Sequence, residues 1–469
     1  MHMAGTVTAV PASRNLKKTI MKKSDYNIII PTKGVQVLYN TFSDRFIGLP
    51  RPVAECLASS SPEEFAGRYP AQFERLKEAG VFIPDDFSEL ESIRGRYRSA
   101  VSGGKDMYVM IFPTQDCNLK CWYCYESHVK GSRMDRDVMR RSVKSIKGLI
   151  DSRKPESLLL GFFGGEPLID FHDIAYPLSM EIKRYAEERG VRFATFIVTN
   201  ASLIDGNVLS ILPDINPMLQ ITLDGNRGKH DSVRIWKKDG SGSYDTIIDA
   251  ITRLSRTLRN DFSEDPSLTV RINYDNQTLR YADDIIRDLA NADKNNIVVH
   301  FERVWQTQHL VDERQRELLL ETLRKFISNG FTVRHGVFRK KNVSCPSDTR
   351  DFMIINYDGN LYKCNGRTLT PESREGHLSE DGKIVWDEGM LAKRYSHVTF
   401  ENPKCLACKM LPLCMGPCTQ KYMETGRYCD TICSKTSIDF TVDDYILTEF
   451  EIRYILQHTG SKEVDDHSV

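Results

Sequence analysis

Strand and helix patterns alternate six times between Met107 and Ser328, and this alternation limits the possible folds more than any other feature of the chain. The strands are short apolar runs, predicted at 107–113, 158–163, 192–198, 219–223, 268–274 and 297–301. Successive β/α units build a parallel sheet with helices outside it. Six units are too few to close an eight-stranded barrel. We therefore expect an open, partial (β/α)6 TIM-like barrel with its active site at the carboxyl ends of the strands.

A loop directly after the first predicted strand carries three cysteines, Cys117, Cys121 and Cys124, with the spacing C-x3-C-x2-C. A 4Fe–4S cubane normally takes four thiolates, so a loop that supplies three leaves one iron open for chemistry. Half of a zinc site is the alternative, because C-x2-C is also a zinc spacing. His128 is the only close candidate for a fourth zinc ligand in the sequence.

The cysteine loop resembles the signature of the radical SAM enzymes. In that family the open iron binds S-adenosylmethionine (SAM), and the reduced cluster cleaves it to a 5'-deoxyadenosyl radical that abstracts hydrogen. The resemblance implies that the three cysteines are catalytic and hold the cluster. Later strand ends match the family pattern in order, as Gly-Gly-Glu-Pro at 164–167, Thr-Asn at 199–200 and Thr-Leu-Asp-Gly at 222–225. The SAM contacts that the resemblance implies are Tyr123, Gly164, Gly165, Glu166, Thr199, Asn200, Thr222 and Arg234.

These positions also have purely structural explanations. The sequence GG-x-P at 164–167 would form a tight turn between a strand and a helix. Asn200 would cap a helix, Asp224 would form a turn, and Arg234 would make a surface ion pair. The order of the segments along the strand ends favours the SAM interpretation. Asn273, at the end of the fifth strand, is a weaker candidate for contact with SAM or substrate.

Eight further cysteines lie between Cys345 and Cys433. Their spacing resembles the SPASM extension of radical SAM enzymes: C-x13-G-x4-C at 345–364, then C-x2-C-x5-C-x3-C at 405–418. By this resemblance the chain carries three 4Fe–4S clusters, one that binds SAM and two auxiliary. The nearer auxiliary cluster would be held by Cys345, Cys364 and Cys418, and the farther one by Cys405, Cys408, Cys414 and Cys433. Two zinc ions are the alternative. Either Cys429 completes the nearer cluster, or one of its irons is open to substrate.

The segment from about Ser24 to Asp86 predicts a small winged-helix module. Two strands at 26–31 and 35–39, helices at 52–58 and 62–79, and a closing strand at 80–84 make up this module. It resembles the leader-recognition element of peptide maturases, which adds a substrate strand to its sheet edge. The domains expected are a tail at 1–24, the module and linker at 25–98, a radical SAM core at 99–330, a SPASM domain with a closing helix at 331–459, and a tail at 460–469.

Composition and charge exclude several classes of function. The chain has 64 Lys and Arg against 64 Asp and Glu, which gives no indication of a nucleic-acid or membrane partner. Twelve cysteines without a secretion signal indicate metal binding in the cytoplasm rather than disulfides.

The resemblance implies a SAM-dependent peptide maturase that forms a thioether, ether or carbon–carbon crosslink in a ribosomally made precursor peptide with a leader. An electron donor such as flavodoxin or ferredoxin would reduce it. The alternatives are a maturase of the anaerobic sulfatase type, which oxidises Cys or Ser to formylglycine, and a non-catalytic peptide-binding homologue.

Overall fold

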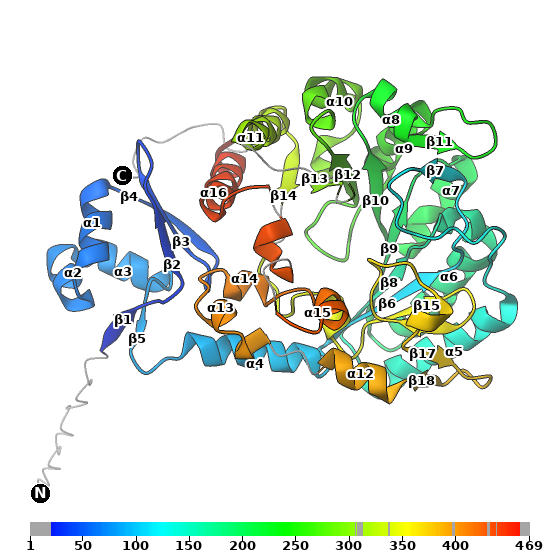
Figure 1. Cartoon of the computed structure of the whole chain (residues 1–469), viewed down its shortest axis with the longest axis horizontal. Helices are drawn as coiled ribbons and strands as arrows, with labels where there is room; N and C mark the ends of the chain where they lie inside the picture. Colours follow the sequence, from blue (N-terminus) through cyan, green and yellow to red (C-terminus); the bar gives the residue numbers. More distant parts are fainter. Residues whose placement is uncertain are drawn as a thin grey trace, which may run out of the picture. The chain divides into compact units, whose positions relative to one another are not determined.

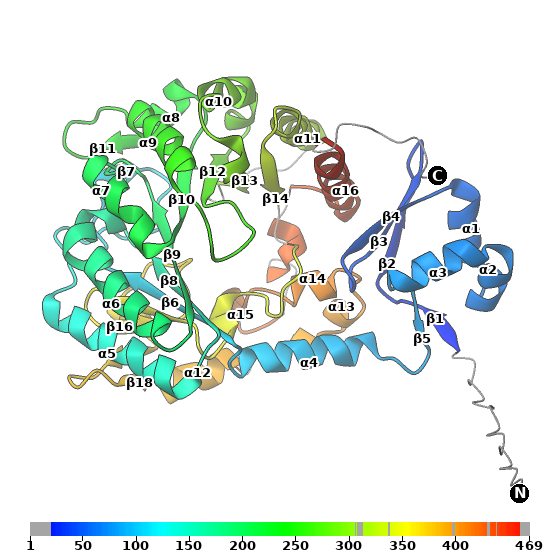
Figure 2. The same ribbon diagram turned by 180° about the vertical axis from the view of Figure 1, so that it is seen from behind.

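The computed structural model of the chain divides into two compact units, Met1–Ser92 and Ile93–Val469 (Figures 1 and 2). The residues that the structure describes are 20–304, 306, 313–335, 338–395, 399–428, 432–437 and 439–459. Most of the predicted 1–24 tail, the whole 460–469 tail and Cys429 lie outside the described residues. None of the described helices is long and apolar enough to cross a membrane.

The N-terminal unit contains an antiparallel meander followed by three helices. The meander consists of β2 (Asn27–Ile30), β3 (Gln36–Asn40) and β4 (Arg45–Leu49). A separate pair joins β1 (Met21–Lys23) to β5 (Phe82–Pro84). The helices are α1 (Arg51–Ser59), α2 (Pro62–Arg68) and α3 (Pro70–Glu78). Their core includes Leu38, Leu57, Phe65, Leu76 and Phe82.

Two details of this unit differ from the sequence expectation. The single helix expected at 62–79 is two helices, because Tyr69 precedes Pro70 and the residue before a proline is pushed out of helical conformation. Strands β1 and β4 were not expected, since both are short and contain charged residues, and β4 also contains Gly48. The strands therefore form a meander ahead of the helices, and β5 pairs with β1 rather than with the meander.

The second unit is built on an eleven-stranded, mostly parallel sheet. Its order is β14-β13-β12-β10-β9-β8-β6-β15-β16-β17-β18. The parallel strands are β6 (Asp106–Phe112), β8 (Ser157–Phe162), β9 (Arg192–Thr199), β10 (Pro217–Leu223), β12 (Leu268–Tyr274), β13 (Ile297–Arg303), β14 (Thr332–His335) and β15 (Met353–Asn356). The antiparallel strands are β16 (Asn360–Tyr362), β17 (Gly376–Leu378) and β18 (Ile384–Trp386).

All six predicted strands are present, but the sheet is larger than the six units expected. Strand β14 extends it after α11, and β15 pairs with β6 at the other side. Both added strands have only four residues, which gave a weak periodic signal. Among the described residues no pairing joins the edge strands β14 and β18, so the sheet is open as expected.

Helices connect the parallel strands and cover the sheet (Figure 1). They are α5 (Arg136–Arg153), α6 (Tyr176–Glu187), α7 (Gly206–Ile211), α8 (Arg227–Val233), α9 (Tyr244–Thr257), α10 (Ala282–Asp288) and α11 (Glu313–Ser328). In α9 the buried residues Ile247, Ala250, Ile251 and Leu254 recur at helical spacing, and this apolar stripe packs on the sheet.

The C-terminal region consists mainly of short helices, except at its end. These are α12 (Glu388–Tyr395), α13 (Pro403–Leu406), α14 (Leu411–Cys414) and α15 (Thr419–Thr425). The closing helix expected within 331–459 is α16 (Val442–Thr459), which lies beside α11 in both views (Figures 1 and 2). Arg324 and Glu451 join the two helices as an ion pair at 3.0 Å. Helix α4 (Glu89–Val101) lies where a linker was expected.

Candidate active site

The three-cysteine loop leaves the carboxyl end of β6 and forms one wall of the candidate active site. Its middle is the short strand β7 (Leu119–Cys121), which pairs with β11 (Arg234–Trp236) so that Cys121 lies opposite Arg234. This pairing brings the loop to the segment that follows β10. Cys117 is buried, Cys121 is half-buried and Cys124 is exposed.

Hydrogen bonds hold the loop in place around Cys117. The Leu119 N–H lies 3.4 Å from the Cys117 sulfur, and Asn200 Nδ2 lies 3.7 Å from it. Burial raises the pKa of the Cys117 thiol to about 12, and the charges of Glu166 and Cys121 act in the same direction. Because a thiol must lose its proton to bind iron, cluster binding at this site would release protons.

The candidate zinc ligand His128 also lies near this loop, with Nε2 3.5 Å from the Cys124 sulfur. Within the described ranges, no three His, Cys, Asp or Glu side chains close around one point as the ligands of a single metal ion do. A cubane differs from a single ion because it has four irons and takes four thiolates, so its ligands are spread more widely.

The Gly164-Gly165-Glu166 segment packs directly against the cysteine loop. Gly164 has φ of +114°, and a Cβ there would lie 2.3 Å from the Thr114 carbonyl oxygen. A Cβ on Gly165 would lie 2.0 Å from the Asp116 carbonyl oxygen. The Glu166 N–H donates to that same oxygen at 2.9 Å. Only glycine therefore permits the turn after β8 to approach the loop this closely.

The Glu166 carboxylate is fully buried and organises the turn after β9. It accepts hydrogen bonds from Thr199 Oγ1 at 2.7 Å, from the Asn200 N–H at 2.7 Å and from the Leu168 N–H at 3.0 Å. Burial raises its pKa, although these three hydrogen bonds oppose the rise. The side chain thus joins the strand ends of β8 and β9, while Gly164 and Gly165 remain half-exposed.

Asn200 connects the turn after β9 to the cysteine loop instead of capping a helix. Its Nδ2 donates to Asn118 Oδ1 at 2.9 Å, and its Oδ1 accepts from Ser202 N and Oγ at 2.9 and 2.6 Å. The cap of α7 is Asp205. Thr222 is half-buried on the face of β10 that points away from the core residue Ile221.

Tyr123 is the centre of a buried hydrogen-bond network. Its hydroxyl donates to the Asp224 carboxylate, with O–O distances of 2.7 and 2.8 Å. Arg234 Nη1 and Asn273 Nδ2 each donate to the same hydroxyl at 3.0 Å. Arg234 also lies 3.5 Å from Asp224. The network joins the cysteine loop to the ends of β10 and β12.

His230 contacts this network through the backbone of Asp224. The Asp224 N–H donates to His230 Nδ1 at 3.3 Å, and the other ring nitrogen lies 3.1 Å from Ser243 Oγ. Burial, followed by the charge of Arg234, holds the pKa of His230 well below its usual range. The ring is therefore neutral, with its proton on Nε2.

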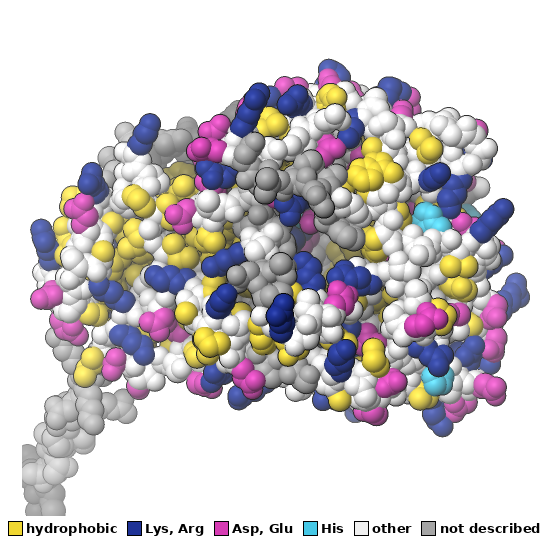
Figure 3. Space-filling model, viewed as in Figure 1, with side chains coloured by type: hydrophobic (Ala, Val, Ile, Leu, Met, Phe, Trp, Pro, Cys, Tyr) yellow, Lys and Arg dark blue, Asp and Glu magenta, His cyan; other side chains and the backbone are white. Residues whose placement is uncertain are grey.

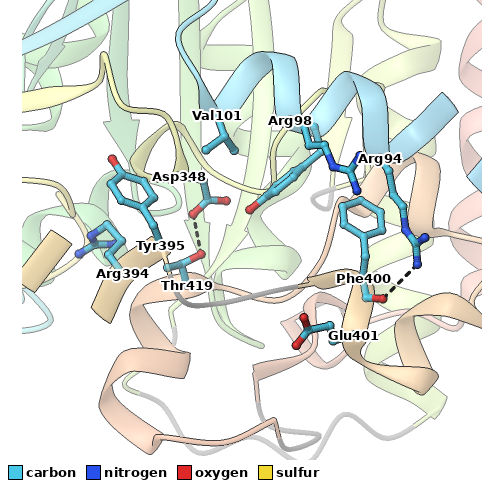
Figure 4. Close-up of a pocket in the computed structure, with 10 residues that line it drawn as sticks. Arg94, Arg98, Val101, Asp348, Arg394, Tyr395, Phe400, Glu401 and Thr419 are labelled. Atoms are coloured by element: carbon cyan, nitrogen blue, oxygen red, sulfur yellow. Dashed lines mark hydrogen bonds between the residues drawn. The ribbon is translucent and has the colours of Figure 1, made fainter. Parts of the chain in front are cut away.

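The cysteines of the C-terminal region lie in two places, and their assignment to two clusters stays a prediction. Asp348 joins the turn after Cys345 to the start of α15 by accepting from Thr419 Oγ1 at 2.5 Å (Figure 4). Cys418 is the residue immediately before that helix. Burial raises the pKa of the Cys364 thiol to about 11, and the charges of Cys345 and Cys418 add to this rise.

The second group surrounds a cavity. Cys405, Cys408, Cys414 and Cys433 all line one space of about 550 Å³, together with apolar side chains that include Met410 and Leu411. Burial raises the pKa of the Cys405 thiol to about 11, and the charges of Cys414, Cys433 and Cys408 act in the same direction.

The sequence did not single out several residues of the site. Within the cysteine loop, Asn118 Oδ1 accepts a hydrogen bond from Asn200 Nδ2. Gln306 Nε2 donates a hydrogen bond to the Tyr123 carbonyl of the same loop. Glu126 is buried two residues after Cys124, and neither of its oxygens has a hydrogen-bond partner in the described part of the chain. A carboxylate directly after a cysteine loop was the one signal available for it.

Comparison with known proteins identifies the domain that contains this site. Residues 111–289 match the Radical SAM superfamily model. This part of the chain is a radical SAM domain. The matched segment contains the three-cysteine loop and every strand end that contributes to the Tyr123 network.

Three relatives describe how far the likeness extends. An uncharacterized protein of Methanocaldococcus jannaschii is 23% identical over 310 residues, which are 64% of this chain and 100% of the relative. The radical SAM cyclopropyl synthase TigE of Paramaledivibacter caminithermalis is 21% identical over 376 residues, 73% of this chain and 74% of TigE. The structure of native anSMEcpe with bound AdoMet and the Kp18Cys peptide has a TM-score of 0.55 and 18% identity over 76% of this chain and 99% of that one. This structural likeness concerns the fold.

Proposed function

We propose that this radical SAM enzyme is a peptide maturase that forms a side-chain crosslink in a ribosomally made precursor peptide. The observation that carries the proposal is the meeting of three strand-end segments with the cysteine loop, in a chain that also carries two further cysteine groups. The match to a cyclopropyl synthase over 73% of the chain supports it, as does a solved protein of the same fold that binds both AdoMet and a peptide.

Cys117, Cys121 and Cys124 would hold a 4Fe–4S cluster, since three thiols on one loop are the donor set that leaves an iron open. When bound and reduced, the cluster and SAM supply a carbon radical that takes hydrogen from an unactivated C–H bond. Arg234 Nε is buried and has no hydrogen-bond partner among the described residues, so it has a donor available for the SAM carboxylate.

The chain's own residues would position SAM. Asp224 and Tyr123 hold the Arg234 guanidinium in one orientation, and Asn273 fixes the Tyr123 hydroxyl from β12. Glu166 fixes the turns after β8 and β9, and the half-exposed backbone at Gly164 and Gly165 would contact SAM. Thr222 would lie near the ribose. Burial of this network excludes water from the charged groups, which strengthens their interactions.

The two C-terminal cysteine groups would hold auxiliary 4Fe–4S clusters. The farther group fits a cluster because its four thiols line one cavity of about 550 Å³. The nearer group consists of Cys345, Cys364 and Cys418, whose charges affect one another. Auxiliary clusters would accept the electron that remains after hydrogen abstraction, and a flavodoxin or ferredoxin would supply electrons for SAM cleavage.

The N-terminal unit would bind the leader of the precursor. Strand β4 has a strand neighbour on one side, β3, and none on its other side among the described residues. A disordered leader could add there as a further strand through backbone hydrogen bonds. Hydrophobic side chains gather on the visible face of this unit (Figure 3), and half-exposed apolar residues of the meander include Ile28, Phe46 and Ile47. Tethering the leader raises the effective concentration of the core peptide.

A direct test uses the anaerobically reconstituted chain with SAM, dithionite and the short precursor peptide encoded beside its gene. We expect 5'-deoxyadenosine together with a peptide that has lost one pair of hydrogen atoms. The same peptide without its leader should be modified much more slowly, while basal SAM cleavage should persist. Equal modification rates for the two peptides would contradict leader binding, and absence of 5'-deoxyadenosine would contradict the proposed function as a whole.

A further inference from the structure

Arg394, in the last turn of α12, is among the largest fully buried side chains of the described residues. Its side chain is 1% exposed. Two hydrogen bonds join it to the Glu375 carboxylate, from Nε at 2.8 Å and from Nη2 at 2.7 Å. Nη2 also donates to Gln420 Oε1 at 2.9 Å. This forked geometry fixes the plane of the guanidinium group.

The remaining nitrogen, Nη1, is buried and has no hydrogen-bond partner in the part of the chain that the structure describes. Leaving a buried donor unsatisfied costs about 1–3 kcal/mol, and more for a charged group. A buried donor of this kind needs an explanation, and an acceptor outside the polypeptide supplies one.

The surroundings of Arg394 identify the kind of acceptor. Arg394 lines a small cavity of about 80 Å³ with Glu375, Gln420 and the thiol-bearing Cys364. Burial raises the pKa of the Cys364 thiol, and the positive charge of Arg394 opposes this rise. Gln420 follows Cys418 by two residues. Arg394 also lies at the opposite end of a second cavity from Arg94 and Arg98 (Figure 4).

We propose that Arg394 Nη1 donates a hydrogen bond to a sulfur atom of the nearer auxiliary cluster and thereby raises its reduction potential. The inference rests on the proposed function, because it assumes a cluster at Cys345, Cys364 and Cys418. Hydrogen bonds to the sulfurs are among the factors that set the potential of an iron–sulfur cluster. A reduced cluster carries one more negative charge than an oxidised one, so a charged donor stabilises the reduced form more.

The chain offers a matched control in Arg367. It lines the same cavity, and the charges of Cys364 and Cys418 help to raise its pKa after the leading effect of its hydrogen bond to Glu424. Unlike Arg394, it uses all of its nitrogens within the protein. Nε and Nη2 donate to Glu424 at 2.8 and 2.9 Å, and Nη1 donates to the Gly366 carbonyl at 2.7 Å. An Arg-to-Lys change at either position keeps the positive charge, but only the change at 394 removes a free donor.

The test compares Arg394→Lys with Arg367→Lys in the full-length, reconstituted chain. Both carry Cys117→Ala, Cys121→Ala and Cys124→Ala, so that redox signals come from the auxiliary sites. In a potentiometric titration followed by electron paramagnetic resonance, the midpoint of one auxiliary cluster should move to lower potential in Arg394→Lys. The midpoints of Arg367→Lys should equal those of the parent, which is the chain with the three cysteine changes and both arginines intact. Equal midpoints for both variants, at parental iron content, overturn the inference but not the proposed function.

A second measurement needs no substitution at Arg394 and remains informative if that variant fails to fold. The parent is produced with ¹⁵N-labelled arginine, and pulsed electron paramagnetic resonance is recorded on the reduced auxiliary clusters. A coupling between a cluster and an arginine ¹⁵N is expected in the parent and in Arg367→Lys. No such coupling overturns the inference. An iron content that leaves no cluster at the nearer cysteines would contradict the proposed auxiliary site and the inference together.

Discussion

At the residue scale, the site depends on a few side chains that each satisfy several partners. The Tyr123 hydroxyl has one acceptor, Asp224, and two donors, Arg234 and Asn273. These residues come from three separate parts of the barrel. Burial raises the pKa of Asp224, and the charge of Arg234 is the main effect that opposes this rise. A buried pair of this kind is sensitive to the loss of any member.

Tyr123→Phe should therefore destabilise the chain by about 1–3 kcal/mol, because Arg234 and Asn273 lose their buried acceptor. Tyr176→Phe is the matched control, since the Tyr176 hydroxyl donates to Asp214 at the same 2.7 Å but lies at the surface. That change should cost about 0.5 kcal/mol or less. Urea unfolding of the two variants measures the difference, and equal losses would refute the role given to the buried network.

His230 predicts a pH dependence of stability. Its folded-state pKa is held well below the usual value by burial and by Arg234. Below the unfolded-state pKa of about 6.5, His230 is protonated in the unfolded chain but stays neutral in the folded chain. The free energy of unfolding therefore falls as the pH falls. In His230→Gln this loss should be smaller by up to about 1.4 kcal/mol per pH unit. Urea unfolding at several pH values from neutral to acidic is the measurement, and identical slopes for the two proteins would exclude this explanation.

Residue roles could be predicted only partly from the sequence. The cysteine groups were predictable because their spacing is local, and Gly164 and Gly165 because a tight approach needs glycine. The Tyr123–Asp224 bond was not, since it joins residues 101 positions apart. Glu166 was expected to bind SAM directly; the structure shows that its oxygens hold Thr199 and Asn200, and its contact with SAM stays a prediction.

At the scale of elements, strong periodic patterns were predictable and short strands were not. Helices α9 and α11 belong to the alternating pattern that the sequence predicts, and each has a continuous apolar stripe. Strand β4 was missed because Arg45 and Gly48 interrupt its apolar pattern. Strand β14, with the sequence Thr-Val-Arg-His, gives almost no strand signal and is placed by its neighbour β13. Strands β4 and β14 therefore depend on pairing with their neighbours in the sheet rather than on local strand propensity.

The turn after β8 gives an element-scale prediction. Gly165→Ala should destabilise the chain by about 1–3 kcal/mol or more, because its Cβ would overlap the backbone of the cysteine loop. Iron bound at that loop should fall as well. Gly148→Ala, in the middle of α5 with open space around it, should instead stabilise the chain by about 0.5–1 kcal/mol. Unfolding and iron analysis of the two variants provide the comparison, and a stable Gly165→Ala protein with parental iron would count against the packing described here.

At the scale of the whole molecule, the chain combines a radical SAM domain, built on an open and mostly parallel sheet, with two further cysteine groups and a separate N-terminal unit. Three cubanes predict about twelve irons per chain after anaerobic reconstitution. Replacing Cys117, Cys121 and Cys124 with alanine should remove about four of them and leave the rest. Iron and sulfide analysis checks this number, and a chain prepared without oxygen that contains zinc and little iron would contradict it.

The role of Cys429 separates two forms of the nearer auxiliary cluster. Cys429 lies outside the described residues, so the alternatives stay as the sequence left them. We expect Cys429→Ala to keep the parental iron content, because a cluster with an open iron needs only Cys345, Cys364 and Cys418. An open iron would lower the pKa of a substrate thiol and favour a thioether product. Loss of iron in this variant would instead assign Cys429 as the fourth ligand.

The measurement that tests the central claim most directly follows a hydrogen atom from the peptide to the SAM product. The reduced chain is incubated with SAM and a leader-bearing precursor that is deuterated at its side-chain carbons. If the chain abstracts hydrogen from the peptide, deuterium appears in 5'-deoxyadenosine in proportion to the modified peptide. Modified peptide accompanied by unlabelled 5'-deoxyadenosine would contradict the account, and so would labelled product from the variant that lacks Cys117, Cys121 and Cys124.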